Sequence, residues 1–278
     1  MKELSLREIQ LSSLNILKVV ADICEKQSIN YSLAYGSLLG AVRHKGFIPW
    51  DDDLDIMMSR PEYERFIEYF LAHQKEMYPL KLLNMDTEPK CPHVISRVTD
   101  TNYYLKVKNE KEYGLGTFID IYVIDGLGDN EKEAASVIKK TMAYPTFIFL
   151  ATRKHYNSGF AKGFLRKSVK FIMYLYAHFM GKWYFVNKLH KKLELLKYEN
   201  SRYVGIAAWG GRPKNPYEKV MRKEWIENTF LVDFEQYKIR ISKYYDEILK
   251  LNFGNYMQLP PPKDRVPHHL YKAYKKQL

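Results

Sequence analysis

The chain has 278 residues, a formal net charge of +12, and 46% hydrophobic and 15% aromatic residues. This apolar content excludes a disordered chain, because it supplies enough side chains to offset the entropy of ordering the backbone. The presence of only two cysteines, Cys24 and Cys91, excludes a disulfide framework and a zinc site built on thiolates. There is no apolar secretion signal and no run of about 18 apolar residues, so we expect a cytoplasmic protein.

The charge is unevenly distributed along the chain. Residues 1–130 contain 15 Lys and Arg against 20 Asp and Glu, a net −5, whereas residues 131–278 contain 29 against 12, a net +17. Within the second part, residues 134–193 hold 12 basic residues, no acidic ones and many aromatics. We interpret this segment as an interface for a lipid-linked glycan or for an anionic membrane, contacted peripherally on its inner face. A helical region with a solvated basic face would give the same pattern.

The first 130 residues alternate between helix and strand patterns. Apolar residues at helical spacing predict an amphipathic helix over 4–28, and Ser59 followed by Pro61 predicts the start of another. Shorter β-prone runs predict strands at 31–35, 53–58, 81–85, 93–99, 103–107 and 117–125. Beyond about residue 130 the pattern is helical, with segments near 131–151, 161–197 and 233–252.

These patterns predict an α+β fold with a mixed sheet core flanked by helices and a basic helical part at the C-terminal end. We place the catalytic core at residues 1–130 and the mainly helical, acceptor- or membrane-facing part at 131–278. No repeat or low-complexity linker separates the two, so we expect them to pack closely.

Four aspartates, Asp51, Asp52, Asp53 and Asp55, lie within five residues. Because side chains alternate along a strand, we expect the three odd-numbered aspartates to share one face and Asp52 to point away. Carboxylates this close remain ionised together only around a cation, and such oxygen ligands suit Mg²⁺ or Mn²⁺. Asp120, inside an apolar run, is either a further ligand or the buried partner of an arginine. A solvated acidic loop is the alternative for the cluster.

The turn at Gly36 and Ser37 supplies a second candidate feature. Backbone N–H groups at a helix start attract phosphate, and glycine allows close approach of a ligand. Arg43, His44 and Lys45 follow within a few residues and are candidate cationic contacts to the same phosphates. Each feature alone is typical of an ordinary turn or an exposed helix end, but together with the acidic run they predict a metal-dependent transferase that acts on a phosphate-containing donor.

The run from Tyr35 to Ile56 resembles the signature of LicD-type phosphotransferases. These are bacterial phosphorylcholine transferases and relatives that modify teichoic acids or capsules, and they are similar to the fukutin group of animal glycosylation enzymes. Further matches lie at 63–66, 118–126 and 253–261, the last leading to His268. The resemblance implies a nucleotidyltransferase-like fold.

The resemblance also implies roles for particular residues. It places metal ligands at Asp53, Asp55 and Asp120, makes Gly36 and Ser37 the phosphate turn, and leaves Asp51 as a ligand or a base. The chain has no animal-type cysteine cluster, so we expect Mg²⁺ or Mn²⁺ and no zinc.

The implied reaction is that of a transferase of substituted phosphate groups. A CDP-linked alcohol such as CDP-choline, CDP-ribitol or CDP-glycerol is the expected donor, and a hydroxyl of a cell-surface glycan precursor is the expected acceptor. A nucleotidyltransferase acting on a nucleic acid or a small molecule is the alternative, and a non-catalytic glycan-binding relative is a third interpretation. The length of the match disfavours a nucleic acid as partner. The sequence leaves open the alcohol, the accepting hydroxyl and the oligomeric state.

Overall fold

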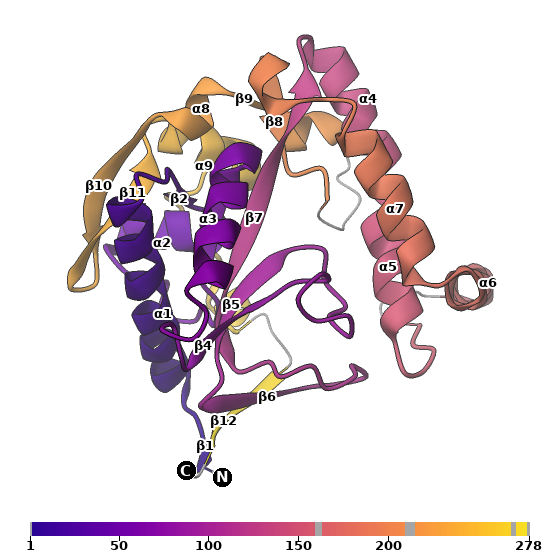
Figure 1. The fold of residues 1–278 in the computed structure, drawn as a ribbon, viewed down its shortest axis with the longest axis horizontal. Coiled ribbons are helices and arrows are strands. Elements are labelled where there is room, and N and C mark those ends of the chain that lie inside the picture. The colour runs from indigo at the N-terminus through magenta and orange to yellow at the C-terminus, as the bar shows by residue number, and fades with distance from the viewer. Residues whose placement is uncertain (1, 159–162, 209–214, 268–270, 277–278) are drawn as a thin grey trace.

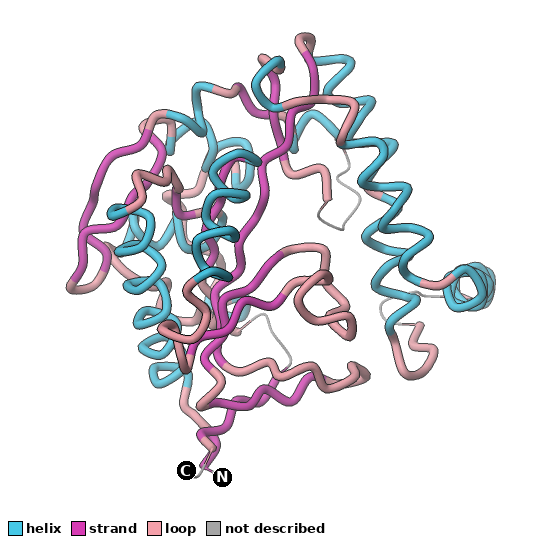
Figure 2. The backbone as a smooth tube through the Cα atoms, viewed as in Figure 1, coloured by secondary structure: helices cyan, strands magenta, loops and turns pink. Residues whose placement is uncertain are grey.

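A computed structural model describes residues 2–158, 163–208, 215–267 and 271–276, so His268 lies outside the described residues. The fold is α+β, with a mixed sheet, helices against it and a helix-rich flank (Figures 1 and 2). In the described segments, no helix combines the length and the apolarity that a membrane span requires.

The central feature is a seven-stranded sheet in the order β2-β3-β7-β5-β4, to which β8 and β9 add beyond β7. Strands β3 and β7 are parallel neighbours and the other pairs are antiparallel. The strands are β2 (Ser32–Leu33), β3 (Asp55–Ser59), β4 (Leu80–Leu83), β5 (Ser96–Asp100), β7 (Thr117–Gly128), β8 (Tyr203–Gly205) and β9 (Met221–Arg222). The sheet therefore draws strands from both halves of the sequence.

Three helices of the first half pack on this sheet: α1 (Leu6–Lys26), α2 (Tyr35–His44) and α3 (Arg60–Ala72). Helices α1 and α3 contact β7, and α2 contacts β3. Phe66 and Phe70 of α3 are fully buried in the main hydrophobic core, which the spacing of four residues explains because it places both rings on one helix face. The core thus fixes β3 and β7 between helices.

The helix-rich flank consists of α4 (Glu131–Thr141), α5 (Ala143–Thr152), α6 (Phe164–Met180) and α7 (Lys182–Leu193). In Figure 1, α4, α5 and α7 lie beside the sheet, and α6 is seen end-on at the outer edge of the molecule. The sequence predicted one helix over 161–197, but the chain turns at Gly181, which adopts a φ of 73° that interrupts a right-handed helix. Similarly, the predicted helix over 131–151 is divided at Met142.

The predicted helix over 233–252 is wrong in its first half. Residues there form a hairpin of β10 (Thr229–Phe234) and β11 (Tyr237–Ser242), and only α9 (Tyr245–Phe253) is helical. Ile239 and Ile241 are both buried, which is the period of two that characterises a strand. The short helix α8 (Glu224–Glu227) precedes the hairpin.

A second sheet joins the two ends of the chain. It has the order β1-β12-β6, formed by β1 (Lys2–Glu3), β12 (Tyr271–Lys275) and β6 (Tyr103–Val107). Short 3₁₀ turns lie at Tyr198–Asn200, Pro216–Lys219 and Pro262–Asp264.

Candidate active site

Two buried carboxylates lie side by side on the adjacent parallel strands β3 and β7. Asp55 is the first residue of β3 and lies in register with Asp120 of β7. Register partners on adjacent strands project to the same face of a sheet, so the two side chains are neighbours. The backbone N–H of Asp55 donates to Ser37 Oγ at 2.8 Å, which joins the start of β3 to α2.

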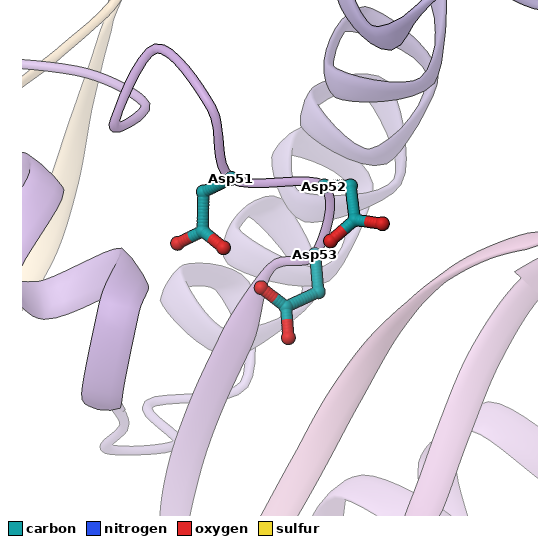
Figure 3. Close-up of side chains that lie close together, drawn as sticks. All are labelled: Asp51, Asp52 and Asp53. Carbon is teal, nitrogen blue, oxygen red and sulfur yellow. The ribbon is translucent and has the colours of Figure 1, made fainter. Parts of the chain in front are cut away.

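The preceding acidic segment is not a strand, and this corrects the expectation for Asp52. Because β3 begins only at Asp55, side-chain alternation does not apply to residues 51–53. One carboxylate oxygen from each of Asp51, Asp52 and Asp53 lies within 4.8 Å of the other two, and Figure 3 shows the three side chains gathered around one bend of the chain. Asp52 is therefore part of the cluster.

The cluster and the strand pair form one electrostatic unit. Burial and the neighbouring charges of Asp53 and Asp120 raise the pKa of Asp55 well above its ordinary value, and Asp51 adds to this effect. Within the part of the chain that the structure describes, no donor hydrogen-bonds to Asp55 Oδ1, which is buried. A buried carboxylate oxygen without a donor costs free energy unless a cation is bound to it. These oxygen donors therefore suit Mg²⁺ or Mn²⁺.

Asp120 is also the buried partner of an arginine, which is one of the two roles that the sequence allowed for it. Arg97 of β5 donates from Nε to Asp120 Oδ1 at 2.6 Å and from Nη2 to Oδ2 at 3.4 Å. The Arg97 guanidinium is buried, stacks 4.2 Å from the Phe118 ring centroid and also donates to the Tyr113 hydroxyl. Asp120 thus sits between Asp55 and a fixed positive charge.

Gly36 and Ser37 lie in the first turn of α2, directly beside the acidic segment. A Cβ atom at Gly36 would lie 2.4 Å from Asp51 Oδ2, a distance that real Cβ atoms essentially never show. Glycine is therefore required for Asp51 to approach the helix start this closely. Ser37 is buried, and its hydroxyl positions β3 as described above.

The three cationic candidates lie at the other end of α2. Arg43 Nη1 donates to the Tyr256 carbonyl at 2.7 Å, and Arg43 Nε donates to His44 Nε2 at 3.0 Å. Burial lowers the pKa of His44, and Arg43 lowers it further. Lys45 ends the helix in the left-handed conformation, with a φ of 55°. The His44 ring lies 6.3 Å from that of Trp50, the residue before the acidic segment.

Tertiary structure brings further charged groups near the site that sequence reasoning missed. The guanidinium carbon of Arg265 lies 5.7 Å from the Trp50 ring centroid, and Lys219 Nζ lies 3.5 Å from the Tyr35 hydroxyl. Both come from the C-terminal half, so no local pattern could connect them to the site. Arg97 had a signal, since a charged residue inside a predicted strand requires a buried partner.

The chain is similar in sequence to known proteins. Residues 28–149 match the family model described as the LicD/FKTN/FKRP nucleotidyltransferase domain. The chain is 32% identical over 280 aligned positions, covering 99% of both chains, to the lipopolysaccharide cholinephosphotransferase LicD of Haemophilus influenzae. An uncharacterised protein of Rickettsia typhi is 50% identical over 71 residues, covering 26% of this chain and 23% of its own. An uncharacterised protein of Rickettsia prowazekii is 50% identical over 46 residues, covering 16% of this chain and 17% of its own.

The fold and the matched domain define a transferase of phosphate-containing groups with a nucleotidyltransferase domain. The chain belongs to the LicD family, since its similarity to the Haemophilus enzyme extends over almost its whole length.

Proposed function

We propose that this protein transfers phosphocholine, or a related alcohol phosphate such as ribitol or glycerol phosphate, from a CDP-linked donor to a hydroxyl of a cell-surface glycan precursor. The observation that carries the proposal is the buried Asp55–Asp120 pair beside the Asp51–Asp53 cluster, in a chain aligned end to end with a cholinephosphotransferase. A lipopolysaccharide, teichoic acid or capsule precursor fits as acceptor.

The donor pyrophosphate requires charge compensation during the transfer. Asp53, Asp55 and Asp120 would hold Mg²⁺ or Mn²⁺, which would supply that compensation. Two observations support this assignment. Asp55 Oδ1 is buried and accepts no hydrogen bond from the described residues, and the negative charges of Asp53 and Asp120 act on the same carboxylate. We assign no liganding role to Asp52, whose carboxylate lies in the same cluster.

The chain's own residues then position the donor and move the proton. N–H groups at Gly36 and Ser37 orient the donor phosphates, and Arg43, His44 and Lys45 face the leaving nucleotide. Asp51 is the favoured base, because Asp120 is already assigned to the metal and accepts hydrogen bonds from Arg97. The acceptor oxygen bonds to the phosphorus that carries the alcohol, the bond from that phosphorus to CMP breaks, and the products are a phosphodiester and CMP.

A donor panel tests the proposal. Purified protein is incubated with Mg²⁺ and CDP-choline, CDP-ribitol or CDP-glycerol, with a glycan acceptor extract, and CMP release is measured. We expect metal-dependent release with one donor and none in the Asp53→Asn variant. Release of pyrophosphate from a nucleoside triphosphate, without CMP release from any CDP-alcohol, would instead establish the alternative nucleotidyltransferase activity.

A further inference from the structure

Helix α6 exposes an apolar face to solvent. Six apolar side chains on it are at least half exposed, and we call them the apolar stripe: Phe164 (88%), Leu165 (76%), Val169 (50%), Ile172 (64%), Leu175 (50%) and Phe179 (88%). The steps of three and four residues from Leu165 to Phe179 place these side chains along one side of the helix. An apolar face of this length is unusual on a protein surface and indicates a binding function.

The opposite face of α6 fastens the helix to the rest of the protein. Ala177 is fully buried, and Met173 and Met180 pack into the hydrophobic cluster formed with α5 and α7. Lys170 donates to the Ser158 carbonyl at 2.9 Å. Because one face is anchored, the apolar stripe points outward, and Figure 1 shows α6 at the outer edge of the molecule.

Basic residues accompany the apolar stripe. Arg166 and Lys167 are exposed in the same turn of α6 as Leu165, and no acidic residue occurs between residues 134 and 193. Trp183, 43% exposed, follows at the start of α7. Apolar residues beside lysine, arginine and tryptophan are the composition of helices that lie in the interface of an anionic bilayer.

We propose that α6 is an interfacial helix that inserts its apolar stripe into the surface of an anionic lipid bilayer. A second copy of this chain fits less well, because residues 134–193 contain no acidic side chain that could pair with Arg166 and Lys167 of the other copy. An anionic surface neutralises those charges instead. Lipid binding requires neither donor nor metal, so this inference and the proposed function can fail independently.

Vesicle flotation tests the proposal on the full-length protein. We expect the protein to float with vesicles of equal parts phosphatidylglycerol and phosphatidylcholine, and to remain unbound with phosphatidylcholine alone. The double variant Ile172→Glu, Phe179→Glu should lower the bound fraction at least fivefold. The matched control is Leu231→Glu on β10, which adds charge at an exposed leucine (49%) on another element and should bind as the wild type does.

A fluorescent label reports insertion directly. Both native cysteines are buried, so an environment-sensitive dye attached to Phe179→Cys labels one site. We expect a blue shift on adding the anionic vesicles, and none with the dye at Leu231→Cys. Absence of flotation at low salt would overturn the proposal, provided that circular dichroism shows a folded protein. So would a concentration-dependent dimer that the double variant converts to a monomer, since the stripe would then join two copies.

Discussion

We assign Asp51, Asp53, Asp55 and Asp120 to catalysis, and these aspartates differ in how much the stability of the fold depends on them. Asp53 is partly exposed and lies in a loop, whereas Asp120 neutralises the buried Arg97. Removing one partner of a buried ion pair leaves a buried charge uncompensated, which costs more free energy than a change at a partly exposed position where water screens the charges. The two classes of aspartate should therefore separate catalysis from stability.

We predict that Asp53→Asn abolishes transfer with little change in thermal stability, and that Asp120→Asn abolishes transfer and also costs about 3–5 kcal/mol of stability. Asp55→Asn should abolish transfer while the protein stays folded, since an amide relieves the buried carboxylate of its charge. CMP release and chemical denaturation on the same preparations measure both effects. Undiminished turnover in either Asp53→Asn or Asp55→Asn would remove these residues from the mechanism.

Gly36 is the residue whose size the site constrains most clearly. We predict that Gly36→Ala lowers kcat/KM by about 100-fold or more, because the new methyl group displaces the Asp51 carboxylate from the helix start. The steady-state rate with donor in excess, together with the melting temperature, provides the measurement. Gly114→Ala is a control for glycine replacement away from the site, since no atom lies within 4 Å of a Cβ there, although its φ of 80° adds strain. Equal loss of activity in both variants would contradict the local explanation.

At the scale of the element, helix α2 connects the two functional ends of the site. Its first turn contacts Asp51 and β3, and its last turn carries the cationic candidates. Arg43 also has a structural role through the Tyr256 carbonyl, so its replacement would mix binding with stability. Lys45 is exposed, so its replacement tests the effect of side-chain charge on donor binding with less effect on stability than replacement of Arg43.

We predict that Lys45→Gln raises the donor KM by about tenfold and changes kcat little, because it removes a charge that binds the donor in the ground state. Lys18→Gln, which removes an exposed lysine of α1 that pairs with Asp22, is the matched control. Both KM values come from CMP release over a range of donor concentrations. A wild-type KM for Lys45→Gln would show that this side chain does not contact the donor.

At the scale of the whole molecule, the helix-rich flank is tied to the sheet region by a buried ion pair. Glu110, in the segment between β6 and β7, accepts from Arg153 at the end of α5 at 2.6 Å. Burial raises the pKa of Glu110, but His93, whose Nε2 lies 3.7 Å from Glu110 Oε1, and the ion pair with Arg153 outweigh burial and lower the pKa to about 2. The ion pair therefore contributes its full stabilisation at pH values above about 4.5, where Glu110 is ionised in the unfolded chain as well as in the folded protein.

We predict that Glu110→Gln costs about 3 kcal/mol of stability at pH 7. The wild type should lose this advantage as the pH falls from about 4.5 towards 2, because the unfolded chain takes up the proton first and the folded state resists it. Urea denaturation of both proteins at several pH values measures the difference. A difference that stays constant down to pH 2.5 would show that the charge of Glu110 is not what stabilises the fold.

The sequence was most informative where the determinants are local. The helices near residues 4–28 and after Ser59 are confirmed, as are the strands around residues 81–85, 93–99, 103–107 and 117–125 within a few residues. Apolar periodicity and helix starts depend on neighbours along the chain, which the sequence displays directly. The α+β class and the LicD family likewise followed from periodicity and from one continuous run of residues.

What only the tertiary structure decided are relations between distant residues. Whether Asp52 joins the cluster depends on where β3 begins to pair, and the partner of Asp120 depends on the register of β5 against β7. The hairpin at 229–242 is a different case, because apolar and polar residues alternate along β11 in the sequence itself, and the helix prediction followed the wrong period. The basic content of residues 134–193 was visible in the sequence, but which helix exposes its apolar face is set by packing on α5 and α7. Burial and strand register arise from long-range contacts, and no pattern along the chain encodes them by itself.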